Sequence, residues 1–326
     1  MNHSSPWYHE APHGCDPHLN FPAKGIQMTK SDIPRQLWKA SLHGGHSSGY
    51  CDHAQSTLEE IIEAALAFGY TTFGVTEHAP RVEAQHLFAE ETAMGWTVDT
   101  LDRLFRDYAA ELDRLTARYA DRLGILKGFE ADVVPVDRYP QIMRGYKEAL
   151  NFDYIVGSVH YVGGIIVDYT PEFFEQAAEA SGGLEALGIA YYRTVADMVC
   201  RLKPDVVGHF DFIRRGFPDE TSAFSPPIRR AALEALEVIR DANAILDVNT
   251  SGFRKGVGSP FPGPVYLRAA RDMDIGVCFG DDSHQVAHVG AGIEAARTCL
   301  LECGYEHITV LERASNGLNR HKASLI

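Results

Sequence analysis

The stretch Thr71-Thr-Phe-Gly-Val-Thr-Glu-His78-Ala-Pro80 contains the pattern on which the fold prediction depends. Its first six residues are rich in β-branched and aromatic side chains, which is typical of a buried strand. Two ionisable side chains, Glu77 and His78, follow at once. Polar residues directly after an apolar strand indicate an active-site position, because a parallel barrel builds its site from the loops at the carboxyl ends of its strands.

The same pattern recurs along the chain. Short apolar runs alternate with amphipathic helical runs such as 57–68, 100–119 and 227–242, and this alternation favours a parallel sheet made of β-α-β units. We predict seven strands: Lys39–Leu42, Thr71–Thr76, Gly124–Phe129, Tyr154–Val159, Asp205–Gly208, Ala244–Val248 and Gly276–Phe279. A further apolar run, 307–311, is expected outside the main sheet, and 168–202 is expected to be a longer helical excursion that helps to cover the site.

Composition excludes several classes of protein. The 326 residues are 45% hydrophobic and 23% charged, as in a globular protein, and the formal net charge of −14 opposes binding to nucleic acid. No run of about 18 apolar residues is present for a membrane span. The six cysteines form no CxxC pair, so we expect a reducing cytoplasm. Oligomeric state stays open.

The N-terminal residues 1–36 show neither helical nor strand periodicity, and we predict an irregular extension followed by one domain over 37–326. Their histidines, His3, His9, His13 and His18, lack a predicted scaffold. We therefore interpret them as part of a mobile tail rather than as a metal site.

Ionisable side chains follow nearly every predicted strand. A single histidine is more often a structural residue than a ligand, but histidines and acids in phase with seven strands favour a shared site. Imidazole and carboxylate groups together suit zinc, manganese or iron, and this set exceeds the four ligands of one tetrahedral ion. We predict two or three divalent metal ions and no organic cofactor.

Six motifs carry a family resemblance over residues 39 to 310. The chain resembles the PHP (polymerase and histidinol phosphatase) domain family, and most of all its histidinol-phosphatase branch. The motifs are His43-Gly-Gly-His46 with Gly49-Tyr-Cys-Asp-His53, Val75-Thr-Glu-His78-Ala-Pro80, Lys127-Gly-Phe-Glu130-Ala-Asp132, Gly157-Ser-Val-His160, Gly208-His209-Phe-Asp211 and Gly280-Asp-Asp-Ser-His284.

The resemblance implies a distorted (β/α)7 TIM-like barrel with a trinuclear metal centre. Its implied ligands are His43, His46, Glu130 and Asp282 for one metal, Glu130, His160 and His209 for a second, and His53, His78 and His284 for a third. The family usually begins with His-x-His, whereas two glycines separate His43 from His46 here. Either the glycines let both imidazoles reach the metal, or only His46 binds.

Phosphate ester hydrolysis is the chemistry that such a centre predicts. We expect direct attack by a metal-bound hydroxide, with Asp282 or His284 supplying the leaving-group proton. Candidate substrate-binding residues are the cations Arg81, Arg214, Arg215, Arg254 and Lys255 for the phosphate, with Asp132, Asp168, Asp211 and Asn249 for the remainder. Each of these residues has an ordinary structural alternative, such as a solvated surface charge, a turn cap or a partner of a metal-bound histidine.

Three functions remain open from the sequence. The first is hydrolysis of L-histidinol phosphate, which the resemblance favours. The second is hydrolysis of another small phosphate ester, such as a nucleotide or sugar phosphate. The third, a non-catalytic metal-binding module, is less consistent with a complete ligand set. Motifs shared across a family do not separate the first two.

Overall fold

The computed structural model describes residues 36–314 and 317–326. Seven parallel strands form a closed barrel in the order β1-β2-β3-β4-β7-β8-β9. These strands are β1 (Ala40–Gly44), β2 (Thr72–His78), β3 (Gly124–Ala131), β4 (Tyr154–Gly157), β7 (Val206–Val207), β8 (Ile245–Asn249) and β9 (Val277–Gly280). Each lies at a predicted strand, so the predicted (β/α)7 barrel is confirmed.

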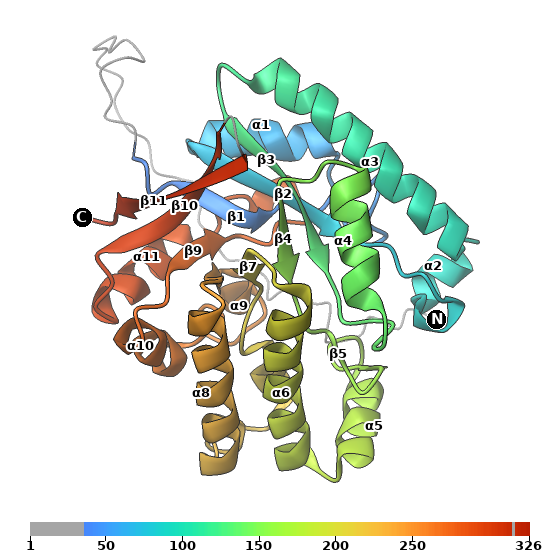
Figure 1. The fold of residues 1–326 in the computed structure, drawn as a ribbon, viewed down its shortest axis with the longest axis vertical. Coiled ribbons are helices and arrows are strands. Elements are labelled where there is room, and N and C mark those ends of the chain that lie inside the picture. The colour runs from blue at the N-terminus through green and yellow to red at the C-terminus, as the bar shows by residue number, and fades with distance from the viewer. Residues whose placement is uncertain (1–35, 315–316) are drawn as a thin grey trace, which may run out of the picture.

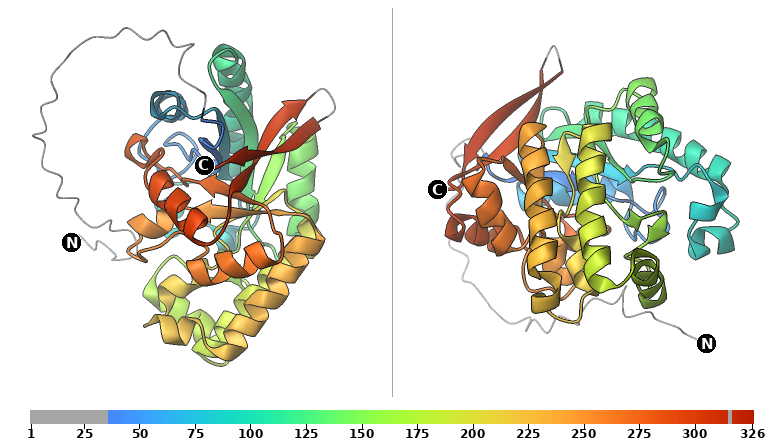
Figure 2. Two further views of the ribbon diagram at one scale, coloured as in Figure 1. Left: turned by 90° about the vertical axis from the view of Figure 1, so that its left-hand side faces the viewer. Right: turned by 60° about the horizontal axis from the view of Figure 1, so that its bottom comes forward.

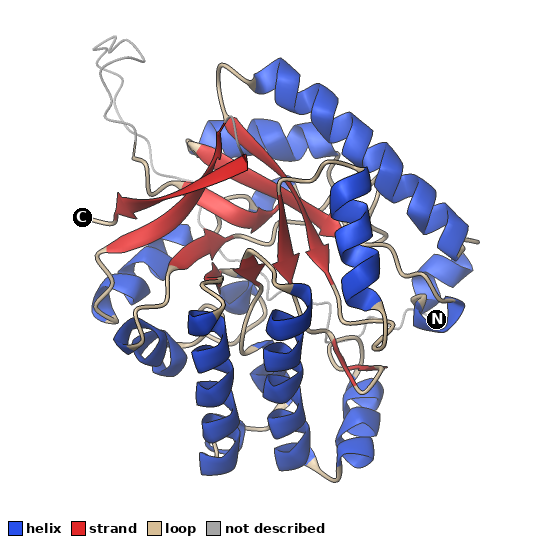
Figure 3. Ribbon diagram, viewed as in Figure 1, coloured by secondary structure: helices blue, strands red, loops and turns tan. Residues whose placement is uncertain are grey.

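Helices cover the outside of the barrel (Figures 1 and 3). The longer ones are α1 (Leu58–Phe68), α3 (Val98–Tyr119), α4 (Tyr139–Ala149), α5 (Pro171–Ser181), α6 (Leu184–Leu202), α8 (Pro226–Asp241), α10 (Pro264–Asp272) and α11 (Ile293–Glu302). Short helical segments are α2 (Ala89–Ala93), α7 (Glu220–Ala223), α9 (Ser251–Arg254), η1 (Ala84–His86), η2 (Phe212–Gly216) and η3 (Val286–His288).

Helix α1 shows how local sequence sets these boundaries. Thr57 and Glu60 form a reciprocal capping box at its start, and Gly69 ends it in the left-handed conformation. The helix buries Leu58, Ile61 and Ile62 on one face, as its apolar periodicity predicts.

Two features differ from the prediction. The excursion over 168–202 is two helices, because Gly182 and Gly183 both adopt positive φ and end α5 before α6 begins. A small antiparallel hairpin, β5 (Tyr161–Val162) and β6 (Ile165–Ile166), precedes it and was not predicted. The predicted run at 307–311 is part of β10 (His307–Ala314), which pairs with β11 (Gly317–Ser324) outside the barrel.

The β10–β11 hairpin closes the end of the barrel where the strands begin. Figure 2 shows this hairpin as a twisted ribbon against the barrel. Leu311 of β10 is fully buried in the barrel interior. Leu311 packs there in a cluster of buried apolar side chains, which we name the floor cluster. Its members are Leu42, Leu126, Tyr154, Val156, Val206, Ile245, Cys278 and Leu311.

Tyr154 is the largest side chain of the floor cluster. Its hydroxyl donates a 2.7 Å hydrogen bond to the carbonyl of Leu42. A Cβ placed on Gly74 would lie 1.9 Å from this hydroxyl, and one on Gly128 would lie 2.5 Å from the ring. The two glycines therefore provide the space that the tyrosine fills.

Among the residues described, no helix is long and apolar enough to cross a membrane.

Candidate metal centre

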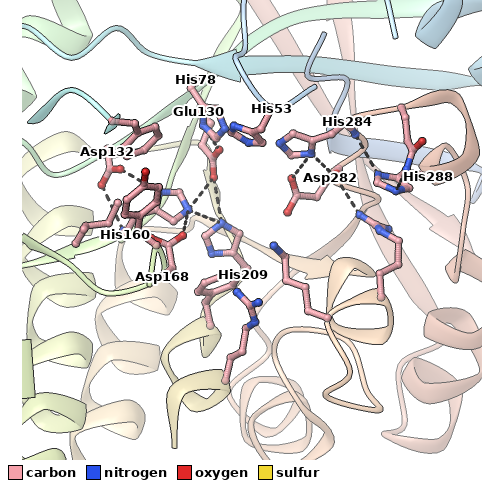
Figure 4. A pocket seen from close by; sticks show the side chains of 18 of the residues that line it. His53, His78, Glu130, Asp132, His160, Asp168, His209, Asp282, His284 and His288 are labelled. Carbon is pink, nitrogen blue, oxygen red and sulfur yellow. Dashed lines mark hydrogen bonds and ion pairs between the residues drawn. The ribbon is translucent and has the colours of Figure 1, made fainter. Parts of the chain in front are cut away.

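A cavity of about 440 Å³ lies at the carboxyl ends of the barrel strands. Figure 4 shows histidines and acids from several strands converging on it. Two of them lie at strand ends, since His78 is the last residue of β2 and Glu130 is the next-to-last residue of β3. His160, His209, Asp282 and His284 follow β4, β7 and β9 within a few residues. The polar positions predicted from strand ends are thus brought together.

His43 and His46 both face this centre despite the two glycines between them. With Asp282 they form one group whose candidate ligand atoms lie within 4.8 Å of one another. The register of β1 shifts at this point, and Gly45 adopts a φ of 76° that favours glycine. The Gly45 amide donates to the Ser283 hydroxyl, which ties this bend to the loop after β9.

Gly44 is required for a different reason. A Cβ at this position would lie 2.7 Å from an oxygen of Asp281 and 2.9 Å from the ring of Phe73. Close packing against Phe73 of β2 and against Asp281, just after β9, thus requires the first glycine, and the backbone turn requires the second. The geometry supports the alternative in which both histidines are ligands.

Glu130 occupies the middle of the candidate centre. Its Oε1 lies 3.1 Å from His209 Nε2, 3.3 Å from His43 Nε2 and 3.8 Å from His160 Nε2. Its Oε2 lies 2.9 Å from His78 Nδ1. Oε1 thus contacts imidazoles assigned to both the first and the second ion, and Oε2 contacts His78 and lies 3.9 Å from His46 Nε2, so Glu130 is central to the whole cluster.

A third group contains His53, His78 and His284, together with the thiol of Cys51. The three histidines match the set that the resemblance implies. Cys51 was not predicted as part of this group.

Three carboxylates face the Nδ1 atoms of candidate histidine ligands, on the side of each ring away from Nε2. Asp247 lies 2.8 Å from His43 Nδ1, Asp132 lies 3.0 Å from His160 Nδ1, and Glu77 lies 3.7 Å from His46 Nδ1. Carboxylates in this position fix the orientation of metal-binding imidazoles. Asp247 was missed in the sequence analysis, which noted Glu77 after its strand without giving it a role, and Asp132 takes its alternative role as the partner of a candidate ligand.

The pKa values of the clustered histidines and carboxylates show how strongly these groups interact, and the ionised carboxylates among them attract cations. Burial lowers the pKa of His46, but the carboxylate of Asp282, 3.4 Å from Nε2, and the nearby Glu77 outweigh this effect and raise that pKa to about 9. Burial likewise opposes a charged His160, yet Asp132 and Asp168 raise its pKa to about 10. For Glu130, His43 and His160 outweigh the effect of burial and hold the pKa well below its usual range.

Buried donor atoms give a direct test of this fit. His43 Nε2 and both ring nitrogens of His46 are buried and make no hydrogen bond to any residue that the structure describes. Lone buried polar atoms are costly, and neutral imidazole nitrogens beside carboxylates can be satisfied by a bound metal ion. The residues therefore fit divalent cations.

Four of the five predicted cations line the cavity: Arg81, Arg215, Arg254 and Lys255. Arg254 donates to the backbone carbonyls of Asp281 and Asp282, which places it beside the candidate ligands. Arg81 is an ion-pair partner of Glu91 and stacks over Phe88. Arg254 and Lys255 are therefore better placed than Arg81 for a phosphate.

Three other substrate-binding predictions, Arg214, Asp211 and Asn249, are not supported, whereas Asp168 lines the cavity. Arg214 does not line the cavity, since its guanidinium pairs with Asp211 at 3.0 Å and donates to Ser259 and to the carbonyl of Pro260. Asp211 is fully buried in this contact. Asn249 is also buried and bonds to Asp247, so its amide orients a carboxylate behind the centre.

Apolar and aromatic residues complete the cavity wall. Phe88 and Tyr169 are stacked with ring centroids 5.4 Å apart. Sequence reasoning did not identify the following lining residues: Gln55, Phe88, Ile166, Tyr169, Phe212, Gln285 and His288. Most lie in loops, where no strand or helix periodicity marks a functional position.

The barrel and its cluster of imidazoles and carboxylates define a metal-dependent hydrolase of the barrel class. Comparison with known proteins makes this more specific. The model of the PHP domain family matches residues 43–251. A probable histidinol-phosphatase of Schizosaccharomyces pombe is 31% identical over 83% of this chain and 89% of its own. This chain belongs to the PHP domain family.

Other relatives agree. The histidinol-phosphatase of Bacillus subtilis is 29% identical over 76% of this chain and 94% of its own. A crystal structure of histidinol phosphate phosphatase from Lactococcus lactis, complexed with zinc, L-histidinol and phosphate, is 21% identical. It superimposes with a TM-score of 0.66 over 87% of this chain and 99% of its own, so the two proteins share the fold.

Proposed function

We propose that this protein is a metal-dependent phosphomonoesterase that hydrolyses L-histidinol phosphate to L-histidinol and phosphate. The observation that carries the proposal is one cavity lined by imidazoles and carboxylates of the candidate metal centre, by the cations Arg215, Arg254 and Lys255, and by the acid Asp168. Such a cavity matches a substrate with a phosphate at one end and an ammonium group at the other. The names of the relatives support this substrate.

The proposed metal ligands are the nine residues of the predicted set. His43, His46, Asp282 and Glu130 would hold one ion, and Glu130 would share a second with His160 and His209. His53, His78 and His284 would hold the third. Bound zinc, manganese or iron would lower the pKa of water and neutralise charge on the phosphate.

Arg254 and Lys255 are the proposed phosphate-binding cations. Arg254 is fixed beside Asp282 by its bonds to two backbone carbonyls. Lys255 is exposed at the cavity wall and lies near Arg215 and Arg254. A cluster of cations at this wall favours the phosphate in both substrate and transition state.

Asp168 is the proposed partner of the substrate ammonium group. Figure 4 places Asp132 and Asp168 across the cavity from His284 and His288. Asp132 is already engaged by His160, whereas the nearest oxygen of Asp168 lies 4.0 Å from that ring. The carboxylate of Asp168 is thus better placed to face a ligand.

Asp282 is the proposed proton carrier. Burial alone would raise its pKa, but His46, 3.4 Å away, and the other surrounding histidines hold the pKa well below its usual range. Asp282 is therefore ionised and would accept the proton of the attacking water before passing it to the leaving oxygen. His284, whose pKa burial and neighbouring His46 depress, is the second candidate.

One panel of assays tests the proposal. Metal-free protein, reloaded with zinc, manganese or iron, is offered histidinol phosphate beside nucleotide and sugar phosphates. We expect the highest kcat/KM with histidinol phosphate. A higher kcat/KM with another ester would show that this ester, and not histidinol phosphate, is the substrate. Inactivity with every metal and ester would favour a non-catalytic module.

The same proposal assigns the protein to histidine biosynthesis in the cytoplasm. Its five described cysteines, Cys51, Cys200, Cys278, Cys299 and Cys303, are all free thiols, as a reducing compartment requires.

A further inference from the structure

We infer that Asp211 and Arg214 are positioning residues that hold the cations of the cavity wall in place for the phosphate. These cations come from two separate loops. Arg215 lies in η2 after β7, whereas Arg254 and Lys255 lie at the end of α9 after β8. The inference rests on the phosphate-binding side proposed above and adds what fixes its geometry.

The ion pair of Asp211 and Arg214 joins these two loops directly. The Asp211 carboxylate lies 3.0 Å from Arg214 Nε and accepts a 2.9 Å hydrogen bond from the Gly263 amide. The Arg214 guanidinium donates to Ser259 Oγ at 2.7 Å and to the Pro260 carbonyl at 2.8 Å. Both charged residues belong to the loop after β7, and their three partners lie between α9 and α10. We name this set of contacts the Asp211–Arg214 anchor.

The anchor lies inside the protein. Asp211 is 0% exposed and Arg214 is 7% exposed. Apolar residues of similar size commonly stabilise an interior at least as well as a buried ion pair does, because two charges lose their water. The pair is therefore better explained by the single geometry that it imposes on the two loops than by a gain in stability.

Aromatic packing places a cation of one loop on the other loop. The rings of Phe212 and Phe261 have centroids 5.2 Å apart, and the Arg214 guanidinium lies 5.0 Å from the Phe261 ring. Lys255 Nζ lies 5.4 Å from the centroid of the Phe212 ring. Because Phe212 directly follows Asp211, a change in the anchor should move the ring on which Lys255 rests.

The second loop is folded back on itself, so the anchor also constrains its cations. The Val257 amide donates a 3.0 Å hydrogen bond to the carbonyl of Gly252. A Cβ on Gly252 would lie only 2.2 Å from the carbonyl oxygen of Ser259. The segment that carries Arg254 and Lys255 is thus packed closely between Gly252 and the anchored Ser259.

Mutual repulsion of the cations gives the anchor its purpose. Desolvation in the cavity and the charges of Arg215 and Arg254 lower the pKa of Lys255, as expected for neighbouring like charges. Loops that were free to move would separate these charges, and phosphate binding would then have to bring them together again. Loops that are already joined remove this cost from binding.

Phosphorus-31 NMR titration of the zinc-loaded protein with inorganic phosphate tests the inference without an activity assay. The double variant Asp211→Asn/Arg214→Met removes both charges, so that no lone charge stays buried. We expect its Kd for phosphate to rise about 10-fold, with unchanged zinc content and unchanged binding of L-histidinol.

Two further variants make the test independent of the folding of the double variant. Ser259→Ala removes one contact of Arg214 and should raise the Kd for phosphate about 2–3-fold. Arg313→Met is the matched control, because it breaks an arginine–aspartate pair of the β10–β11 hairpin at the opposite end of the barrel. It should leave the Kd for phosphate unchanged.

Each outcome separates this inference from the proposed function. An unchanged Kd for phosphate in the folded variants overturns the positioning role, whatever the phosphatase activity, and so does a loss of zinc or of L-histidinol binding in parallel with the loss of phosphate. Weakened phosphate binding in the variants of a protein that hydrolyses no histidinol phosphate supports the inference and removes the proposed substrate. A parent protein that binds no phosphate overturns both.

Discussion

The two ends of the barrel are built from the same seven strands but have opposite chemistry. At the end where the strands begin, the floor cluster is apolar and closed by Leu311 of the C-terminal hairpin. At the other end, Glu130 lies near the end of β3, on the same strand as Leu126 of the floor cluster. A few residues along one strand thus separate packing from chemistry, so substitutions at the two ends should affect different measurements.

The largest effect is expected at the functional end. Glu130→Gln removes the charge on which the histidines of the centre converge, so at least one metal ion should be lost and kcat should fall by about 10³-fold or more. Metal analysis and steady-state kinetics measure this change. Full activity with an unchanged metal content would refute the bridging role.

The opposite end should show the reverse behaviour. Leu311→Ala removes a buried side chain from the floor cluster and should lower the free energy of unfolding by about 2–5 kcal/mol. Denaturant unfolding measures the loss, and kcat/KM of the folded fraction should stay within about twofold of the parent. A large fall in kcat/KM would show that the two ends are coupled.

Asp168→Asn tests the acidic side of the cavity. It should lower kcat/KM for histidinol phosphate by about 10–100-fold, since a charged partner of the substrate ammonium is lost. Phenyl phosphate, which has no ammonium group, is the control substrate and should be hydrolysed at an unchanged rate. Equal losses for both substrates would assign Asp168 to the metal centre instead.

Lys255→Met tests the cationic side. KM for histidinol phosphate should rise about 10-fold, because a long-range attraction to the phosphate is removed while the metal centre is kept. Arg103→Ala, which removes an exposed cation of α3, is the matched control and should leave KM unchanged. If both variants behave alike, net charge rather than position is responsible.

The smallest expected effect is the release of protons from histidines when the metal ions bind. Nearby carboxylates raise the pKa of His46 to about 9 and that of His160 to about 10, and Glu130 and Asp247 outweigh burial and raise the pKa of His43 well above 6.5, so all three carry protons at pH 7 and must lose them to bind metal. Calorimetry in buffers of different ionisation enthalpy should detect about three released protons. Because these values are raised above the ordinary 6.5, the stability that they give the metal-free protein is present below that pH and is lost as pH rises through 9 to 10. Metal binding without proton release would contradict the assignment.

The sequence was sufficient to predict the functional end because its residues have a regular relation to the strands. Each candidate ligand follows an apolar run, and the carboxyl ends of parallel strands meet. The Gly44-Gly45 bend was the uncertain point, and its outcome depended on contacts with Phe73 and Ser283 that are distant in the chain.

Residues behind the centre were harder to predict. Asp247 lies inside an apolar strand and contacts a histidine 204 positions away, so no local pattern marks it. Arg214 resembles a surface cation in the sequence, but the acid three residues before it pairs with it in the interior. Strand β11 was missed because most of its side chains are exposed and polar, and its pairing with β10 rather than its apolar content makes it a strand.

The tyrosine of the floor has a consequence for how this family can change over time. Tyr154 occupies space that exists only because positions 74 and 128 lack side chains. A larger residue at either glycine should therefore be tolerated only in a lineage whose residue 154 is already small, and the three positions should vary together rather than one at a time.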